Sequence, residues 1–250
     1  MTEQVNVAYV FPGQGSQWVG MGRDLYENFD SARAVFDQAD QALGFHLSRL
    51  CFEGPDDELR QTINAQPALA TVSFACLRAA CDVTEGNGLP PPAFVAGHSL
   101  GEYTALAAVG VLDFAITVYL TRERGRLMYE AGLRKPGGMV AIIGLDEASL
   151  AEVCQETDAQ IANVNCPGQL VISGAKENLA KATALAEVRG APRTIPFQWQ
   201  RSVEYMVNES VSTFIEIGPG KVLSGLIRRI NKNVKTLNIG DAKAIKDMAC

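Results

Sequence analysis

The chain has 250 residues, 47% of them hydrophobic and 20% charged, with a formal net charge of −6. This length allows one good-sized domain, or one domain carrying a smaller insert, and the acidic balance gives no reason to expect nucleic-acid binding. The longest apolar runs, such as residues 105–112, are too short to cross a bilayer, so we expect a soluble protein without a membrane partner.

Cysteine and histidine usage argues against a metal centre. The six cysteines, at positions 51, 76, 81, 154, 166 and 250, show no C-x-x-C pairing, and the chain has only two histidines. A zinc site is therefore not expected, and free thiols indicate a reducing, cytoplasmic location.

The N-terminal part begins with a short apolar strand at 5–11 and a glycine-rich loop at 13–17. The loop has Trp18 where a dinucleotide fingerprint requires a third glycine, and it lacks the G-K-[ST] of a phosphate-binding loop. It offers instead Gln14 between two glycines, an amide donor that can approach a ligand closely. Helical patterns follow at 31–43, 56–63 and 67–83, and a Gly/Pro-rich loop at 85–92 comes next.

The chain is organised around residues 94–103, with the sequence FVAGHSLGEY. The apolar run 93–96 predicts the end of a buried strand, and 102–108 predicts a helix. The pattern G-x-S-x-G between a strand and a helix is typical of a nucleophile elbow, which lifts the Ser99 hydroxyl out of the sheet. It also leaves the Leu100 amide free at the start of the helix, where an oxyanion could be held.

Ser99 has a structural alternative. Ser99 and Glu102 also form the S-x-x-E pattern of a helix capping box. Capping accounts for these two residues but not for the glycines on both sides of the turn, so we favour the nucleophile.

The next helix is predicted at 113–131, with Asp113 as its cap. An apolar stripe recurs along it at every fourth position and ends in a cation: Leu112, Ile116, Leu120 and Arg124. The stripe predicts that Arg124 lies on the core-facing side, whereas Arg122 and Arg126 are expected to be solvated. A buried guanidinium needs an anionic partner. That partner is either an internal carboxylate or the carboxylate of a substrate, and the residues alone leave both open.

From residue 138 the pattern changes to short alternating elements. Strands are predicted at 139–144, 161–164, 170–173 and 192–195, and helices at 147–156 and 175–188. This βαββαβ order is that of a ferredoxin-like subdomain, inserted into a larger α/β domain. The final stretch returns to α/β character, with a helix at 199–208, a strand at 213–217, a glycine turn at 218–220, a helix at 221–230 and a strand at 234–238.

Together these motifs resemble one family. Residues 11–17 (FPGQGSQ), 97–103 (GHSLGEY), 124–125 (RG), 163–169 (NVNCPGQ) and 218–221 (GPGK) match, in order, the malonyl-CoA:acyl carrier protein transacylases. The resemblance covers nearly the whole chain. It implies an α/β-hydrolase-like acyltransferase domain at 1–134 and 197–250, with the ferredoxin-like subdomain at 135–196.

The resemblance also implies catalytic roles. Ser99 is similar to the family's acylated nucleophile. The backbone amides of Gln14 and Leu100 match the two that form the oxyanion hole. His98 matches a histidine beside the serine that helps to shape the pocket.

For substrates, the resemblance implies malonyl-CoA and acyl carrier protein, with the CoA thioester as a substrate and no separate cofactor. Arg124 matches the arginine that pairs with the malonyl carboxylate, which favours substrate over an internal partner. Met128, one turn further on, is counted with the substrate-binding residues. Gln198 resembles the residue whose carbonyl orients the catalytic histidine. A basic run is either a solvated face or a docking site for the acidic carrier: Lys221, Arg228, Arg229, Lys232 and Lys235.

The general-base histidine of the family is missing. The family places it on a loop soon after the last strand of the insert, but here 194–196 runs directly into 197–199, and no histidine follows His98. A positioned base contributes about 10²–10⁴ in rate, and loss of the serine's base in a comparable triad has cost on the order of 10⁶. We therefore expect transfer through a malonyl-Ser99 intermediate, in fatty acid synthesis, to be weak in this chain.

Deletion, omission or natural loss would each explain the missing segment. Two alternative functions also stay open. One is an impaired relative that binds acyl-CoA or the carrier without turnover, and the other is a serine thioesterase.

Overall fold

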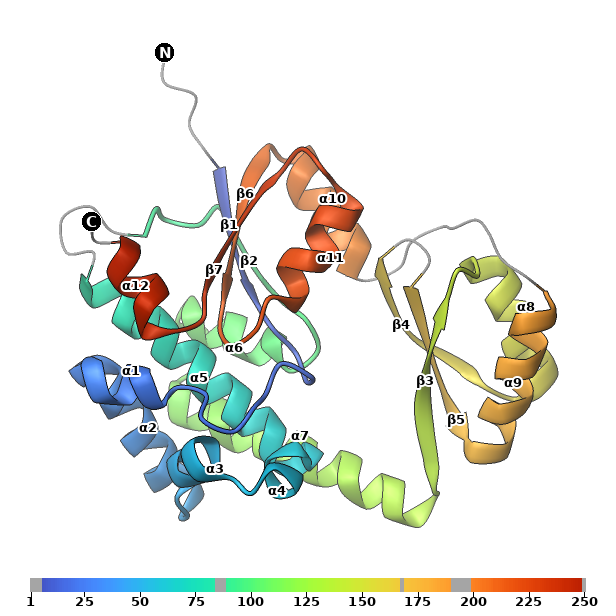
Figure 1. Cartoon of the computed structure of the whole chain (residues 1–250), viewed down its shortest axis with the longest axis horizontal. Helices are drawn as coiled ribbons and strands as arrows, with labels where there is room; N and C mark the ends of the chain where they lie inside the picture. The colour runs from blue at the N-terminus through green and yellow to red at the C-terminus, as the bar shows by residue number, and fades with distance from the viewer. Residues whose placement is uncertain (1–5, 84–88, 167–168, 190–198, 249–250) are drawn as a thin grey trace. The chain divides into compact units, whose positions relative to one another are not determined.

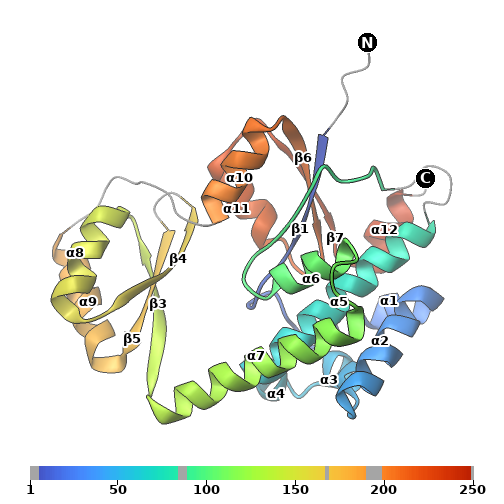
Figure 2. The same cartoon turned by 180° about the vertical axis from the view of Figure 1, so that it is seen from behind.

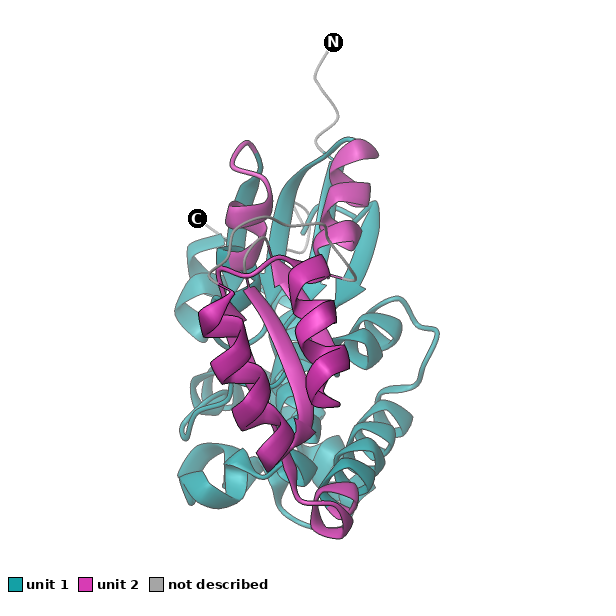
Figure 3. Ribbon diagram, turned by 90° about the vertical axis from the view of Figure 1, so that its right-hand side faces the viewer, with its two compact units in different colours: residues 1–129, 210–225, 234–250 teal, residues 130–209, 226–233 magenta. Residues whose placement is uncertain are grey.

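The computed structural model describes residues 6–83, 89–166, 169–189 and 199–248. The chain divides into two compact units (Figure 3). The first comprises residues 1–129, 210–225 and 234–250, and the second comprises 130–209 and 226–233.

The first unit is built on a parallel sheet whose strand order is β2-β1-β6-β7 (Figure 1). The strands are β1 (Asn6–Phe11), β2 (Phe94–Gly97), β6 (Val211–Ile217) and β7 (Lys235–Ile239). Side chains of β1 are buried from Val7 to Phe11, as expected for the centre of a parallel sheet covered on both faces. Phe11 pairs with Gly97, so the carboxyl ends of β1 and β2 lie side by side. Ligands of open α/β sheets bind at such an edge.

The helices of this unit pack against the sheet or against one another (Figures 1 and 2). They are α1 (Arg23–Asn28), α2 (Asp30–Leu43), α3 (Leu47–Glu53), α4 (Asp56–Arg60), α5 (Thr62–Val83), α6 (Gly101–Ala108), most of α7 (Phe114–Arg134) and α12 (Ala242–Met248). The central helix is α5, which contacts α2, α6, α12 and β6 and buries small residues on nearly every side. Its rigid packing makes it a scaffold for the residues at its N-terminal end.

The second unit contains an antiparallel sheet in the order β3-β5-β4. Its strands are β3 (Gly137–Ile143), β4 (Gln160–Cys166) and β5 (Gln169–Ala175), and its helices are α8 (Glu147–Thr157), α9 (Lys176–Val188), α10 (Trp199–Asn208) and the C-terminal part of α11 (Val222–Ile230). Residues from the sheet, including Leu170 and Ile172, form one core with Leu150 of α8 and Leu179 of α9. The strand predicted at 192–195 lies outside the described residues.

The predicted fold class, an α/β domain with a smaller subdomain, is confirmed. Most predicted elements are present within a few residues of their expected bounds. The prediction that a helix starts at Pro67 is wrong, because α5 begins at Thr62 and carries Pro67 inside it. The short helices α1, α3 and α12 lack a strong apolar period and were not predicted.

The predicted core-facing stripe of α7 is also wrong. Ile116 is 51% exposed, and the buried side is formed instead by Phe114, Thr117, Val118, Thr121 and Gly125. Thr117 and Thr121 can be buried because their hydroxyls donate to the carbonyls of Asp113 and Thr117, each at 2.9 Å. The predicted cap is confirmed, since Asp113 Oδ1 accepts the Ala115 amide at 2.8 Å.

Candidate active site

The site begins at Ser99, which lies two residues after the end of β2 and two residues before the start of α6. Its backbone has a φ of 57°, a left-handed conformation that costs an L-residue about 1–2 kcal/mol. Such strain is typical of functional turns. A Cβ on Gly97 would lie 2.0 Å from the Gly101 carbonyl carbon, and one on Gly101 would lie 2.3 Å from Phe11 O. Only glycine fits at both positions, so the elbow predicted from G-x-S-x-G is present.

The capping alternative for Ser99 does not hold. The N-cap residue of α6 is Leu100, and no side chain caps the helix. The Ser99 hydroxyl oxygen instead accepts a hydrogen bond from Arg124 Nη2 at 3.0 Å.

Arg124 brings a cation to the Ser99 hydroxyl. The residue is half-buried, and besides its bond to Ser99 its Nη1 donates to Gln66 Oε1. Within the described part of the chain, no carboxylate lies at ion-pair distance from Arg124. The internal salt bridge considered from the sequence is therefore absent there.

The contact between α5 and α7 places Arg124. A Cβ on Gly125 would lie 2.5 Å from Thr62 O and 2.7 Å from Ile63 Cα, so α7 rests directly on the backbone of α5. Pro67 has no N–H for the Ile63 carbonyl one turn earlier, and Arg122 Nη1 donates to that carbonyl at 3.0 Å. This small glycine and this guanidinium fix the register of the two helices.

The prediction that Arg122 is solvated is consequently wrong. Arg122 also donates to Asn64 Oδ1, and its guanidinium lies 4.9 Å from the centre of the Phe45 ring. Burial lowers the pKa of Arg122 from its ordinary value. Arg126 pairs with Glu123 at 2.8 Å, with 40% of its side chain exposed.

Gln66 and Thr62 extend the site, although sequence reasoning missed both. Gln66 is fully buried, and its Nε2 donates to Thr62 Oγ1 at 3.0 Å and to Met128 Sδ at 3.3 Å. Thr62 Oγ1 in turn donates to Gln14 Oε1 at 2.9 Å. No local sequence pattern marks either residue, because their partners are about 50–60 positions away.

The loop with Gln14 lies against the elbow. A Cβ on Gly13 would lie 2.7 Å from His98 O, and the His98 amide donates to Phe11 O at 3.1 Å. The two loops therefore meet at the carboxyl ends of β1 and β2. The Leu100 amide makes no hydrogen bond to any residue that the structure describes.

The other predicted residues are placed as follows. Met128 is 45% exposed and contacts Gln66, whereas Gln198 lies outside the described residues. His46, the other histidine of the chain, was not predicted as a site residue: its side chain is 83% exposed, and its Nδ1 lies 3.2 Å from Asp40 Oδ2, so it makes a surface contact.

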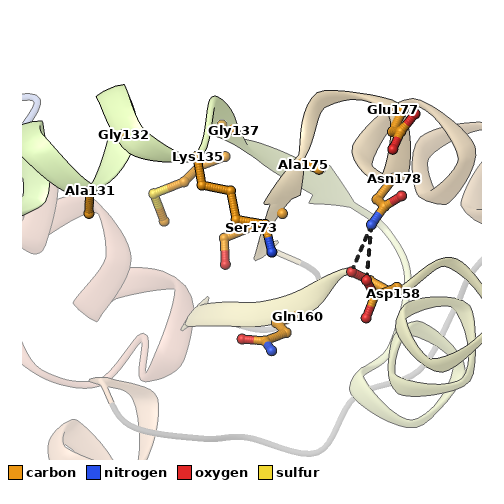
Figure 4. Close-up of a pocket in the computed structure, with 13 residues that line it drawn as sticks. Ala131, Gly132, Lys135, Gly137, Asp158, Gln160, Ser173, Ala175, Glu177 and Asn178 are labelled. Atoms are coloured by element: carbon orange, nitrogen blue, oxygen red, sulfur yellow. Dashed lines mark hydrogen bonds between the residues drawn. The ribbon is translucent and has the colours of Figure 1, made fainter.

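A hollow of about 660 Å³ lies within the second unit (Figure 4). Lys135, Gln160, Ser173 and Asn178 line it among others, and Asn178 Nδ2 donates to Asp158 O at 3.2 Å. None of the predicted site residues lines this hollow. Among the described residues, no group of three His, Cys, Asp or Glu side chains could hold a metal ion, and no helix is long and apolar enough to span a membrane.

The chain is similar to known proteins of one family. The family described as the acyl transferase domain matches residues 8–198. The chain belongs to the acyl transferase family. A malonyl CoA-acyl carrier protein transacylase of Bacillus subtilis is 37% identical over 306 aligned positions, covering 96% of this chain and 95% of the relative.

Solved structures of acyl transferases share the fold. An acyl-carrier-protein-S-malonyltransferase from Bartonella henselae has a TM-score of 0.89 at 37% identity, with 98% of each chain covered. A malonyl-transacylase in complex with a type II PKS acyl-carrier protein has a TM-score of 0.87 at 31% identity, covering 96% of this chain and 98% of that one.

The alignment with the Bacillus relative is longer than this chain. It has 306 positions against the 250 residues of this chain, so at least 56 positions have no residue here.

Proposed function

We propose that Ser99 takes a malonyl group from malonyl-CoA and passes it to the phosphopantetheine thiol of an acyl carrier protein. The observation that carries this proposal is the Arg124 guanidinium, 3.0 Å from Ser99 Oγ and without a described carboxylate partner. In a malonyl ester only one CH₂ separates the ester carbonyl from the free carboxylate. A cation beside the nucleophile therefore suits a short dicarboxylic acyl group, which it can bind through paired hydrogen bonds.

The reaction proceeds by two acyl transfers. Ser99 Oγ attacks the thioester carbonyl, the tetrahedral oxyanion is held by the backbone amides of Gln14 and Leu100, and the C–S bond breaks to release CoA. The carrier thiol then attacks malonyl-Ser99, and the same steps run in reverse. Arg124 holds the malonyl carboxylate throughout.

Proton transfer is the weak step in this chain. Around Ser99 Oγ the described residues supply a donor, Arg124, and no base, so the hydroxyl proton passes to water. The loss of a positioned base lowers the rate by about 10²–10⁴ or more. We propose that the 56 or more unmatched positions include the histidine segment expected after residue 196. Turnover is then slow, while acyl recognition is retained.

Exposed cations support the carrier as acceptor. Lys221, Arg228 and Lys235 are exposed, and Arg229 is exposed while donating to Gln169 Oε1 at 3.2 Å. Basic side chains of this kind attract an acidic partner and raise its association rate. The relative solved with its acyl-carrier protein supports the same class of partner.

A malonyl-CoA-binding protein without turnover is the second candidate. The absence of any histidine after His98 favours it. A thioesterase receives no such support, since a carboxylate-binding arginine does not assist attack by water.

Intact-mass measurement tests the proposal. The protein is incubated with malonyl-CoA for minutes to hours, alongside the Ser99→Ala and Arg124→Ala variants. We expect a slow gain of one malonyl group that Ser99→Ala abolishes and Arg124→Ala strongly reduces. Binding of malonyl-CoA without any gain of mass would support the second candidate. No gain even after the relatives' segment is inserted between residues 196 and 197 would overturn the transfer function.

A further inference from the structure

We propose that Gln66 is the positioning residue that holds Arg124 for the substrate carboxylate, and so sets the preference for a carboxylated acyl group. This inference rests on the proposed function of Arg124. Gln66 makes no hydrogen bond to Ser99 and acts through the guanidinium.

The hydrogen bonds of Gln66 have a fixed direction. A guanidinium has only donors, so the Gln66 oxygen must face Arg124 and its NH₂ must face Thr62. Thr62 Oγ1 then accepts from Gln66 and donates its own proton to Gln14 Oε1 at 2.9 Å. Each group donates to the next along the series, and both ends of the Gln66 amide are satisfied.

Burial makes Gln66 a stable anchor. It is 0% exposed, lies in the first turns of α5 and is followed by Pro67, which restricts the backbone. Arg124 is more exposed and has a long side chain with much rotational freedom. A rigid buried acceptor therefore restricts the guanidinium before a substrate arrives, and such preorganisation strengthens binding.

The two terminal nitrogens of the Arg124 guanidinium have different roles in this arrangement. Nη1 stays on Gln66 Oε1, and Nη2 points to the Ser99 hydroxyl at 3.0 Å. An acyl group on Ser99 brings its carboxylate to the Nη2 side. Gln66 thus holds Nη1, while Nη2 is available to bind the substrate carboxylate.

The test replaces Gln66 with methionine, which has a similar length and cannot accept a strong hydrogen bond. The control is Gln61→Met, because Gln61 is exposed and its side chain is in no hydrogen bond to a described residue. Affinities for malonyl-CoA and acetyl-CoA are measured by calorimetry in a Ser99→Ala background, which prevents acylation.

We expect Gln66→Met to weaken malonyl-CoA binding by about tenfold, the scale of one hydrogen bond to a charged group, and to change acetyl-CoA binding by less than about twofold. A structural defect would weaken both ligands alike. Gln61→Met should leave both affinities unchanged.

A second variant keeps the proposal testable if Gln66→Met does not fold. Gln66→Glu keeps the acceptor but adds a negative charge that pairs with Arg124, so the malonyl preference should fall further. A wild-type protein without malonyl preference would overturn the proposed function itself. A wild-type preference that a folded Gln66 variant retains would overturn only the role of Gln66. Unfolding of both variants would show a purely structural role and would also overturn it.

Discussion

Substituting Gly125 with alanine tests whether the contact between α5 and α7 positions the site. The added Cβ would lie 2.5 Å from Thr62 O, 2.7 Å from Ile63 Cα and 3.1 Å from Thr62 C. All three are backbone atoms, so no rotamer change can relieve the clash.

The expected magnitude follows from these distances. Ordinary contact for a Cβ begins at 3.4 Å, so α7 must move away from Thr62 O by about 0.9 Å. Overpacking of this kind costs about 1–3 kcal/mol, and the better helix propensity of alanine returns up to about 1 kcal/mol. A net loss of about 1–2 kcal/mol lowers Tm by roughly 2–8 °C for a chain of this size. Arg124 moves with the helix, and a misplacement of about 1 Å can cost on the order of 10² in activity.

The matched control lies on the same helix. A Cβ on Gly132 would meet no atom within 4 Å, so Gly132→Ala should hold or raise Tm and leave ligand binding unchanged. Calorimetry gives Tm for both variants. Titration with malonyl-CoA and acetyl-CoA gives the two affinities, whose ratio depends on the position of the Arg124 guanidinium. If Gly125→Ala matched Gly132→Ala in Tm and kept the wild-type malonyl preference, the helix contact would not set the position of Arg124.

Three further changes have defined outcomes. Burial raises the pKa of Tyr9 to about 12, so the stability that its neutral phenol contributes is complete below about pH 10 and is lost between about pH 10 and 12. In urea unfolding at pH 8 and 11, Tyr9→Phe should show a smaller loss of stability at the higher pH. At pH 8 the variant should be less stable by about 1 kcal/mol, because it lacks the hydrogen bond to Pro90 O. Glu216 is fully buried, and its carboxylate accepts hydrogen bonds from the Leu223 and Ser224 amides at 3.0 and 2.8 Å. Glu216→Ala should therefore lower the free energy of unfolding in urea by about 2–4 kcal/mol, and Glu216→Gln should lower it by a smaller amount. If the segment of the Bacillus relative that this chain lacks carries the proposed base, inserting it after residue 196 should raise the rate of Ser99 acylation by about 10²–10⁴ or more, measured by quenched intact mass. An unchanged rate would mean that this segment supplies no missing base.

The elbow could be predicted because its physics is local. Gly97, Ser99 and Gly101 lie within five consecutive residues, and the strand and helix around them have clear patterns. The structure adds the reason for each glycine, since a neighbouring backbone occupies the space of a side chain at both positions. A short turn with such requirements leaves its signature in a single sequence.

The partners of Arg124 could not be predicted in the same way. Gln66 precedes Arg124 by 58 positions, and its role depends on how α5 and α7 pack. The sequence predicts that Arg122 is solvated, because the pattern of neither helix shows its partner. That partner is the Ile63 carbonyl, which lacks its usual helical donor because Pro67 has no N–H. The buried face of α7 was predicted wrongly because it contains threonines. Their hydroxyls donate to backbone carbonyls of the same helix, so these polar residues can be buried. The errors at Gln66 and Arg122 concern polar groups whose partners lie on another helix, whereas the threonine error concerns hydroxyls that bond within their own helix.

Under the proposed function, acyl recognition and proton transfer depend on different parts of this chain. The series from Arg124 through Gln66 and Thr62 to Gln14 lies wholly in the first unit and is complete without a histidine. The base that the sequence lacks would act on the Ser99 hydroxyl and does not appear in that series. Loss of the base therefore removes rate and leaves selectivity, so the ratio of malonyl-CoA to acetyl-CoA affinity reports on this site more directly than turnover does.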